Sequence, residues 1–206
     1  MAHPTPFADR WHETWSLLRE PAPPDLLLRI AARYSEPHRA YHNLQHVVAC
    51  LQQASTIRPR LEAPAEVELA LWYHDVVYDP HRGDNEERSA AFAAEQLRSL
   101  PPGVVESTGS LILSTKHPSA PATSDGRFVV DIDLSILGAP PEAFDDYDAA
   151  IRREYRWVPA PLYRRQRRAI LQAFLDRDRI FATDHFAAIL ESQARANLTR
   201  SITRLS

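Results

Sequence analysis

The sequence predicts an all-α protein in which one domain of 206 residues forms a single helical bundle. Apolar residues recur with the period of a helix, and no segment of strand length alternates apolar and polar residues. Five glycines stand against 17 prolines, so the residues that tight β-turns need are scarce and those that begin or end helices are common. With 44% hydrophobic residues, a chain of this length can bury a sizeable core.

Helices are expected along most of the chain, and several of their ends can be located. Pro24 and Pro64 each stand where a first helical turn would begin, a position that tolerates the missing N–H of proline. Asp84 is expected to cap a helix together with Glu87, three residues later, as a capping box. Residues 118–127 are the most loop-like stretch. The expected helices span 8–19, 24–35, 43–56, 64–78, 85–100, 103–115, 128–137, 141–157, 160–177 and 184–200.

Composition and charge exclude several classes of protein. The net charge of −3 argues against a general nucleic-acid binder. No apolar run approaches the ~18 residues that a membrane-spanning helix needs. The N-terminus lacks the basic start and apolar stretch of a secretory signal, so a cytoplasmic location is expected. The only cysteine, Cys50, allows no intramolecular disulfide and excludes a cysteine-based zinc site.

The His74-Asp75 dyad is the first candidate for chemistry. It follows the apolar run ELALWY, so at least one of the two side chains is expected to point inward. A buried, unpaired charge is costly, and a divalent cation that takes an imidazole nitrogen and a carboxylate oxygen together would remove that cost. The alternative is that His74 hydrogen-bonds its own helix end while Asp75 faces solvent.

Two further segments offer ligands. His42 and His46 are four residues apart and could share one helical face. Because the YHN sequence at 41–43 is typical of the turn before a helix, His46 is favoured as the ligand and His42 as a residue that supports the site or contacts substrate. Asp131 and Asp133 lie in the apolar segment FVVDIDLSIL, where two residues so spaced on a helix point in roughly opposite directions. Only one of them is expected to reach the ion.

Taken together, these segments resemble a known family. A histidine on one helix, an HD dyad ending a second and an aspartate on a third resemble the HD-domain phosphohydrolase superfamily. More specifically, the segments RAYHNLQH, WYHDVVYDP, DNEERSA and DIDLSILG are similar to those of a bacterial family of predicted metal-dependent HD phosphohydrolases. The likeness covers about residues 39–138, and the later EYRWVP and ARANL segments are also similar. It implies one HD-type domain over residues 1–206, with the helices of 141–200 packed on the motif core.

The resemblance also implies a metal centre whose ligands are His46, His74, Asp75 and one of the two later aspartates. Asp133 is preferred because the sequence DLS that begins there is similar to the sequence at the last metal ligand of cyclic-nucleotide phosphodiesterases. Asp131 is its rival.

The number of metal ions follows from the histidines. Binuclear members of the superfamily carry two more histidines between the dyad and the last aspartate, where this chain has only His81 and His117. His81 lies too near the dyad to match that pattern. One divalent transition metal per chain is therefore expected, and Mn²⁺, Fe²⁺, Co²⁺, Ni²⁺ and Zn²⁺ all suit histidine and carboxylate ligands.

The implied activity is hydrolysis of a phosphoester or phosphoanhydride bond in a small phosphorylated substrate, expected to be a nucleotide, by metal-activated water. Asp79 is the expected general base because it lies nearest the ligands in sequence, with Asp84 and Glu86 as alternatives. Lys116 and His117 are expected to face the phosphate or to stabilise the leaving oxygen.

Substrate binding is assigned to cationic residues and to the family-like segments. The arginine-rich stretch 152–168 is either a solvated helix face or a wall that attracts phosphate. The candidates for substrate contact are Arg39, His42, Asn43, Tyr155 and Arg195.

Three matters stay open from the sequence. Release of a terminal phosphate and release of pyrophosphate use the same metal chemistry. The chain could instead be a non-catalytic module that binds a metal and a nucleotide, or a helical adaptor whose histidines are satisfied in the core. A homo-oligomer is compatible with the sequence.

Overall fold

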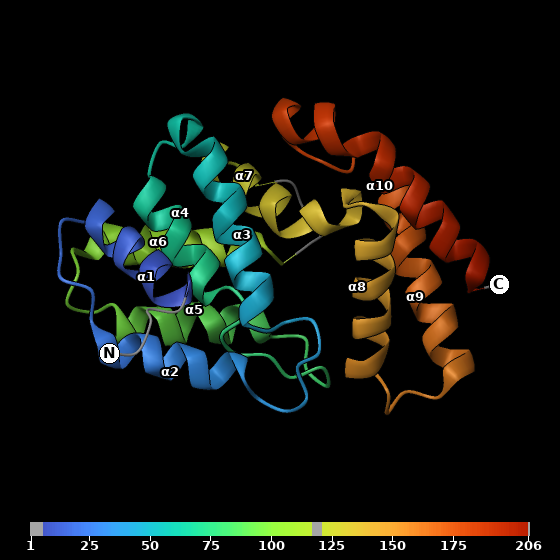
Figure 1. Ribbon diagram of the computed structural model, residues 1–206, viewed down its shortest axis with the longest axis horizontal. Coiled ribbons are helices and arrows are strands. Elements are labelled where there is room, and N and C mark those ends of the chain that lie inside the picture. The colour runs from blue at the N-terminus through green and yellow to red at the C-terminus, as the bar shows by residue number, and fades with distance from the viewer. Residues whose placement is uncertain (1–5, 117–120, 206) are drawn as a thin grey trace. The chain divides into compact units, whose positions relative to one another are not determined.

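The computed structural model describes residues 6–116 and 121–205, and this part of the chain is all-α, which confirms the predicted fold class. Figure 1 shows the helices in chain order. The α-helices are α1 (Pro6–Leu17), α2 (Pro24–Tyr34), α3 (Leu44–Ile57), α4 (Pro64–Tyr73), α5 (Asn85–Gln96), α6 (Pro102–Ser114), α7 (Ser124–Asp133), α8 (Pro141–Glu154), α9 (Ala160–Leu175) and α10 (Asp184–Arg204), and the 3₁₀ helices are η1 (Arg58–Arg60) and η2 (Leu134–Gly138).

The chain divides into two compact units. The first extends to Ile132 and the second begins at Asp133, which is also the last residue of α7. The expected single-domain organisation stays a prediction. No helix in the described part of the chain is long and apolar enough to cross a membrane.

Prolines begin helices as predicted. Pro24 and Pro64 are the first residues of α2 and α4, where the chain needs no N–H donor. The expected capping box at α5 is wrong in one respect. Asp84 occupies the N-cap position, but its side chain makes no capping hydrogen bond. Its carboxylate oxygens instead accept from Arg82 at 2.7 and 2.6 Å.

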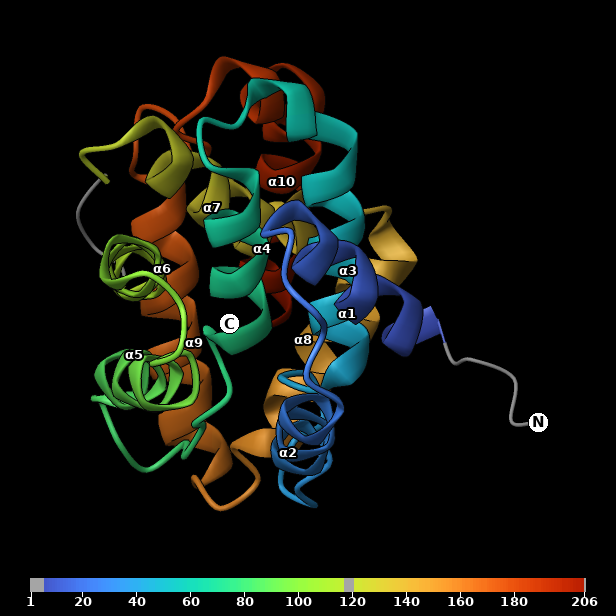
Figure 2. The same ribbon diagram turned by 90° about the vertical axis from the view of Figure 1, so that its left-hand side faces the viewer.

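Helix α4 is the centre of the first unit. It packs against α1, α3, α5 and α6, and Figure 2 shows it among these helices. Every residue from Val67 to Tyr73 is buried, so the helix has no polar stripe, as expected of a helix surrounded by others. Trp72 is anchored edge-on by the rings of Phe7 and Trp11, at centroid distances of 4.9 and 5.2 Å. The C-terminal end of α4 is therefore held firmly, and the HD dyad follows directly.

Two helix boundaries differ from the prediction in ways that matter for the site. Helix α4 ends at Tyr73, not at residue 78, so the dyad lies in the turn that follows. Helix α7 begins at Ser124, so the last four residues of the loop expected at 118–127 are helical, while residues 117–120 lie outside the described part. After Asp133 the helix tightens into η2.

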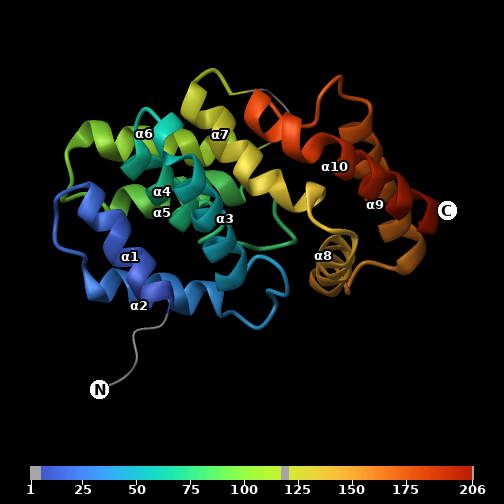
Figure 3. The same cartoon turned by 45° about the horizontal axis from the view of Figure 1, so that its top comes forward.

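The second unit is built around α10, which packs against η2, α8 and α9 (Figure 3). The fully buried Asn197 donates through Nδ2 to the carbonyl oxygens of Leu137 and Ala139, at 2.9 and 2.8 Å. Gly138 lies so close to α10 that an added Cβ would meet Leu190 Cβ at 2.6 Å. The glycine that ends the DIDLSILG segment is therefore required by packing.

Candidate metal centre

The candidate ligands are placed by three helix ends. Asn43 caps α3: its Oδ1 accepts from the Gln45 backbone N–H at 2.9 Å, and its Nδ2 donates to Ala40 O at 3.1 Å. This cap fixes where α3 begins and hence the face on which His46 lies. His74 follows the last residue of α4, and Asp133 ends α7. Asn43, expected to contact substrate, is thus already engaged by the backbone.

Four side chains bring ligand atoms close together. One ligand atom from each of His46, Cys50, His74 and Asp133 lies within 4.8 Å of all the others. All but Asp133 are buried, and Asp133 is partly exposed. Three of the four were predicted ligands, whereas the predicted ligand Asp75 is not in this group; the choice of Asp133 over its fully buried rival Asp131 agrees with the group.

The two histidines point their Nε2 atoms at each other across 3.0 Å. His74 Nδ1 lies 3.0 Å from the Leu71 carbonyl oxygen, an acceptor, so Nδ1 donates to it. His74 Nε2 is then directed at His46 Nε2 and at Asp75 Oδ2, which is 3.1 Å away. Two facing ring nitrogens are stabilised either by a proton that one donates to the other or by a cation that binds both.

The spacing suits a cation. Nitrogen ligands lie about 2.1 Å from Zn²⁺, so two nitrogens 3.0 Å apart would subtend an angle of about 90° at such an ion. An imidazole nitrogen pair with carboxylate and thiol neighbours is a donor set that divalent transition metals accept. These residues therefore fit a metal ion.

Asp75 adds a carboxylate beside the two nitrogens. Its Oδ2 is 3.1 Å from His74 Nε2 and 3.6 Å from His46 Nε2. Burial by itself would raise the pKa of Asp75, but the nearby His74 and, more weakly, His42 hold that pKa well below its usual value. The carboxylate is therefore ionised at neutral pH and supplies negative charge next to the facing nitrogens.

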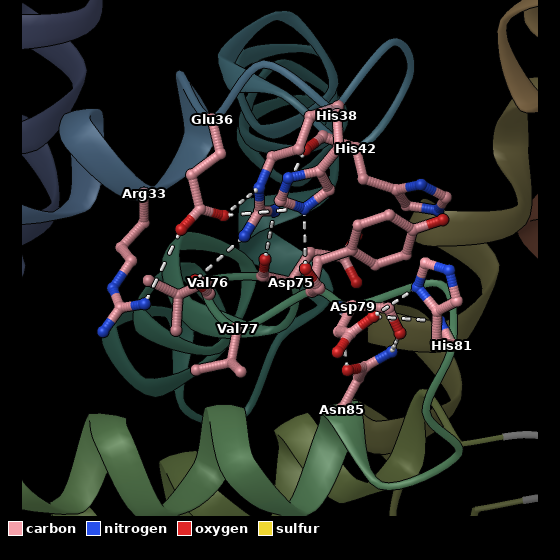
Figure 4. A network of polar contacts seen from close by, with 12 residues as sticks. Arg33, Glu36, His38, His42, Asp75, Val76, Val77, Asp79, His81 and Asn85 are labelled. Atoms are coloured by element: carbon pink, nitrogen blue, oxygen red, sulfur yellow. Dashed lines mark hydrogen bonds and ion pairs between the residues drawn. The ribbon is translucent and has the colours of Figure 1, made fainter. Parts of the chain in front are cut away.

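The turn that carries the dyad is held by Arg39. Its guanidinium donates to the backbone carbonyls of His42 (3.1 Å), Asp75 (2.6 Å) and Val76 (3.1 Å), and its Nε donates to the carboxylate of Glu36 at 3.0 Å. The Arg39 side chain has no exposed surface. Figure 4 shows the backbone of Asp75 and Val76 within this network. These contacts favour a positioning role for Arg39 over the expected contact with phosphate.

His42 lies in the turn before α3, as expected. Its ring stacks on Tyr78 with a centroid distance of 4.2 Å, and it is 6.1 Å from the ring of His46. His42 is also one of the groups that lower the pKa of Asp75. It therefore supports the site electrostatically, and its contact with substrate stays a prediction.

Asp79, the expected general base, is engaged in its own loop. Its Oδ1 is 3.0 Å from both the backbone nitrogen and the ring Nδ1 of His81, and its backbone exchanges two hydrogen bonds with the Asn85 side chain (Figure 4). The contacts with His81 lower the pKa of Asp79. This shift is opposite to the one that suits a general base near neutral pH.

Glu86, one of the alternatives, shows the opposite shift. It lies in the first turn of α5 and is partly buried. Burial raises the pKa of Glu86, and the negative charge of Asp75 raises it further. Among the carboxylates after the dyad, Glu86 therefore has the more suitable basicity.

Lys116 and His117 are the two residues expected near the phosphate. Lys116 forms an ion pair with Glu87, and this contact raises the pKa of the lysine. His117 lies outside the described residues.

The two substrate candidates of the C-terminal segments lie in the second unit. Arg195 donates to Glu191 at 2.8 Å and to the carbonyl oxygens of Leu175, Arg177 and Asp178 at 2.8–3.0 Å. Tyr155 follows the end of α8, and its carbonyl oxygen accepts from Arg152 at 2.7 Å. Arg195 is thus a structural clamp of the loop between α9 and α10, and the substrate roles of both residues stay predictions.

Cys50 is the one member of the four-residue group that the sequence reasoning missed. A count of one cysteine excludes a site built from several cysteines, yet a single thiol can complete a mixed centre. The signal was present: Cys50 follows His46 by four residues on α3, the spacing that places two side chains on one helical face.

Comparison with known proteins adds no identification: no family model, no curated protein and no solved structure matches this chain.

Proposed function

We propose that this protein is a metal-dependent phosphohydrolase that cleaves a phosphoester or phosphoanhydride bond of a small phosphorylated substrate, in the manner of the HD-domain superfamily that its motifs resemble. The observation that carries the proposal is the pair of buried histidines, His46 and His74, whose Nε2 atoms face each other across 3.0 Å beside an ionised Asp75. A divalent cation could bind both nitrogens, and the carboxylate of Asp75 would balance part of its charge.

The residues that would hold the ion are His46, His74 and Asp133, with Asp75 against the two nitrogens. A divalent ion held there supplies Lewis acidity, which lowers the pKa of water and polarises a phosphoryl oxygen.

The chain's own residues have three tasks. Arg39 fixes the backbone carbonyls of Asp75 and Val76 and thereby the direction of the dyad. Asp75 stays ionised and balances positive charge. Glu86, whose pKa is raised by burial and by Asp75, accepts the proton of the attacking water in preference to Asp79.

The test is a search for hydrolysis with identification of the released anion. Purified protein is supplied in turn with Mn²⁺, Fe²⁺, Co²⁺, Ni²⁺ and Zn²⁺ and offered nucleoside mono-, di- and triphosphates, while phosphate and pyrophosphate are measured separately. We expect turnover that falls at least about a hundredfold in His74→Ala, the order of loss seen when transition-state charge stabilisation is removed. His12→Ala, at an exposed histidine of α1, is the matched control.

Two further variants separate the candidate bases. Glu86→Gln is expected to lower the rate more than Asp79→Asn. The reverse order would restore Asp79 as the base. Tight binding of a nucleotide with no release of phosphate or pyrophosphate under any of the five metals would instead favour the non-catalytic binding module.

A further inference from the structure

Cys50 lies where a ligand would. Its Sγ is 3.8 Å from each ring nitrogen of His46. It belongs to the group whose ligand atoms lie within 4.8 Å of one another, together with His46, His74 and Asp133. The side chain is almost fully buried, so the thiol faces these groups rather than solvent.

The simpler reading is that Cys50 only fills space. Its helix also buries Val47, Leu51 and Ala54, and a free cysteine behaves in such a setting as a small hydrophobic residue. A purely apolar role, however, would be served best by a sulfur in contact with carbon atoms. Here the sulfur is directed at the imidazole of His46, one helical turn earlier, which itself faces His74.

We infer that Cys50 is a thiolate ligand of the metal centre and gives it a preference for thiophilic ions, Zn²⁺ and Co²⁺ above Mn²⁺ and Mg²⁺. Soft thiolate ligands favour the first pair, and centres of carboxylate and water favour the second. The inference rests on the metal site of the proposed function and specifies its metal. Binding converts the thiol and the divalent ion into a metal–thiolate bond and releases the thiol proton to solvent.

The spacing agrees with this role. Zinc lies about 2.3 Å from a thiolate sulfur and about 2.1 Å from an imidazole nitrogen. The 3.8 Å between Cys50 Sγ and His46 Nε2 is less than the sum of these two bond lengths, about 4.4 Å, so one ion could reach both atoms.

The sequence makes the inference easy to test, because Cys50 is the only cysteine. Metal-free protein is loaded with Co²⁺ in buffer without thiols, and bound cobalt is quantified by elemental analysis. We expect a thiolate-to-cobalt charge-transfer band in the near ultraviolet. We also expect the band to be lost in Cys50→Ser while cobalt remains bound, since the histidines and carboxylates are intact.

Metal preference provides a second readout. In competition titrations, Cys50→Ser is expected to lose at least about tenfold in affinity for Zn²⁺, a loss that removal of even an outer partner of a metal ligand can cause. Its affinity for Mn²⁺ is expected to change less than about threefold, because a hard ion gains little from sulfur. Circular dichroism melts of the metal-free proteins, with Cys50→Ala as a second variant, establish that both variants fold.

The outcomes separate the inference from the proposed function. Cobalt bound by the wild-type protein without a charge-transfer band, a band that persists in Cys50→Ser, or equal losses of Zn²⁺ and Mn²⁺ affinity would each overturn the role of Cys50 and leave the metal centre standing. Failure of the wild-type protein to bind cobalt at all would overturn both.

Discussion

The histidines beside α4 and the arginines of the C-terminal helices differ in what their polar atoms contact. In the second unit, Arg167 pairs with Asp148 at 2.9 Å, and Arg195 pairs with Glu191 while it also donates to three carbonyl oxygens. Donors there meet acceptors of the same unit. In the first unit, two imidazole nitrogens and a carboxylate face one another instead.

The difference separates residues whose contacts hold the fold from residues whose arrangement could bind a ligand. A donor matched to an acceptor needs nothing further, and most buried polar groups in proteins are matched in this way. Two ring nitrogens and a carboxylate that converge are a set of atoms that can bind a cation. The direction of the two histidine nitrogens is therefore a better guide to a possible ligand site than the number of arginines is.

Arg39 provides the largest expected effect on stability, because it is a buried donor whose acceptors lie in the turn that carries the dyad. Arg39→Ala removes a buried donor from the carbonyls of Asp75 and Val76 and should reduce the free energy of unfolding by about 2–6 kcal/mol, or about 1–3 kcal/mol for each carbonyl. Urea denaturation measures this loss. Arg33→Ala is the matched control, since Arg33 contacts the same Glu36 from an exposed position, and it should cost less than about 1 kcal/mol.

Equal effects of the two substitutions would contradict the positioning role of Arg39. A variant that keeps its stability but loses affinity for a phosphorylated substrate would restore the contact with phosphate that the sequence led us to expect.

Arg195 should show a smaller effect of the same kind. The side chain is about one-third exposed, so Arg195→Ala should reduce the free energy of unfolding by about 1–2 kcal/mol through its lost carbonyl contacts. We expect turnover to be unchanged. Thermal melts and steady-state kinetics measure both effects, with the exposed Arg164→Ala as control. A raised KM with an unchanged Tm would show instead that Arg195 binds substrate.

The smallest expected effect is a pH dependence at Asp145. Hydrogen bonds from Arg204 and Arg200, at 2.9 and 2.8 Å, lower the pKa of Asp145 from 3.8 to about 2. A carboxyl group whose pKa is lowered by folding stabilises the protein above its unfolded pKa, and this contribution is lost as the pH falls through the folded pKa. Between about pH 4 and pH 2, Asp145→Asn should therefore flatten the fall in Tm. Superimposable Tm profiles of variant and wild type in this window would contradict the account.

Much of the fold can be predicted from the sequence because its signals are local. Pro24 and Pro64 begin helices, and helical periodicity identifies each segment between them. The end of α4 could not be predicted. The carbonyls of Asp75 and Val76 accept from Arg39, which lies 36 and 37 residues earlier in the chain, and such long-range contacts leave no local pattern.

The same contrast applies to the site. His46, His74 and Asp133 could be chosen from their types, spacing and apolar surroundings, and they come together in the structure. Asp79 was chosen for its nearness in sequence, but its carboxylate is held by His81. Cys50 could not be chosen as a ligand from the number of cysteines, because that number does not show which side chains share a helical face with His46.

Metal content per chain, measured by elemental analysis of protein purified without added metal or chelator, tests the central claim most directly. The account predicts about one transition-metal ion per wild-type chain, retained in His12→Ala and lost in both His74→Ala and Asp75→Ala while the fold persists. A wild-type protein that holds no metal, even after reconstitution with Mn²⁺, Fe²⁺ or Zn²⁺, would contradict it and leave the facing histidines as a hydrogen-bonded pair in a helical core.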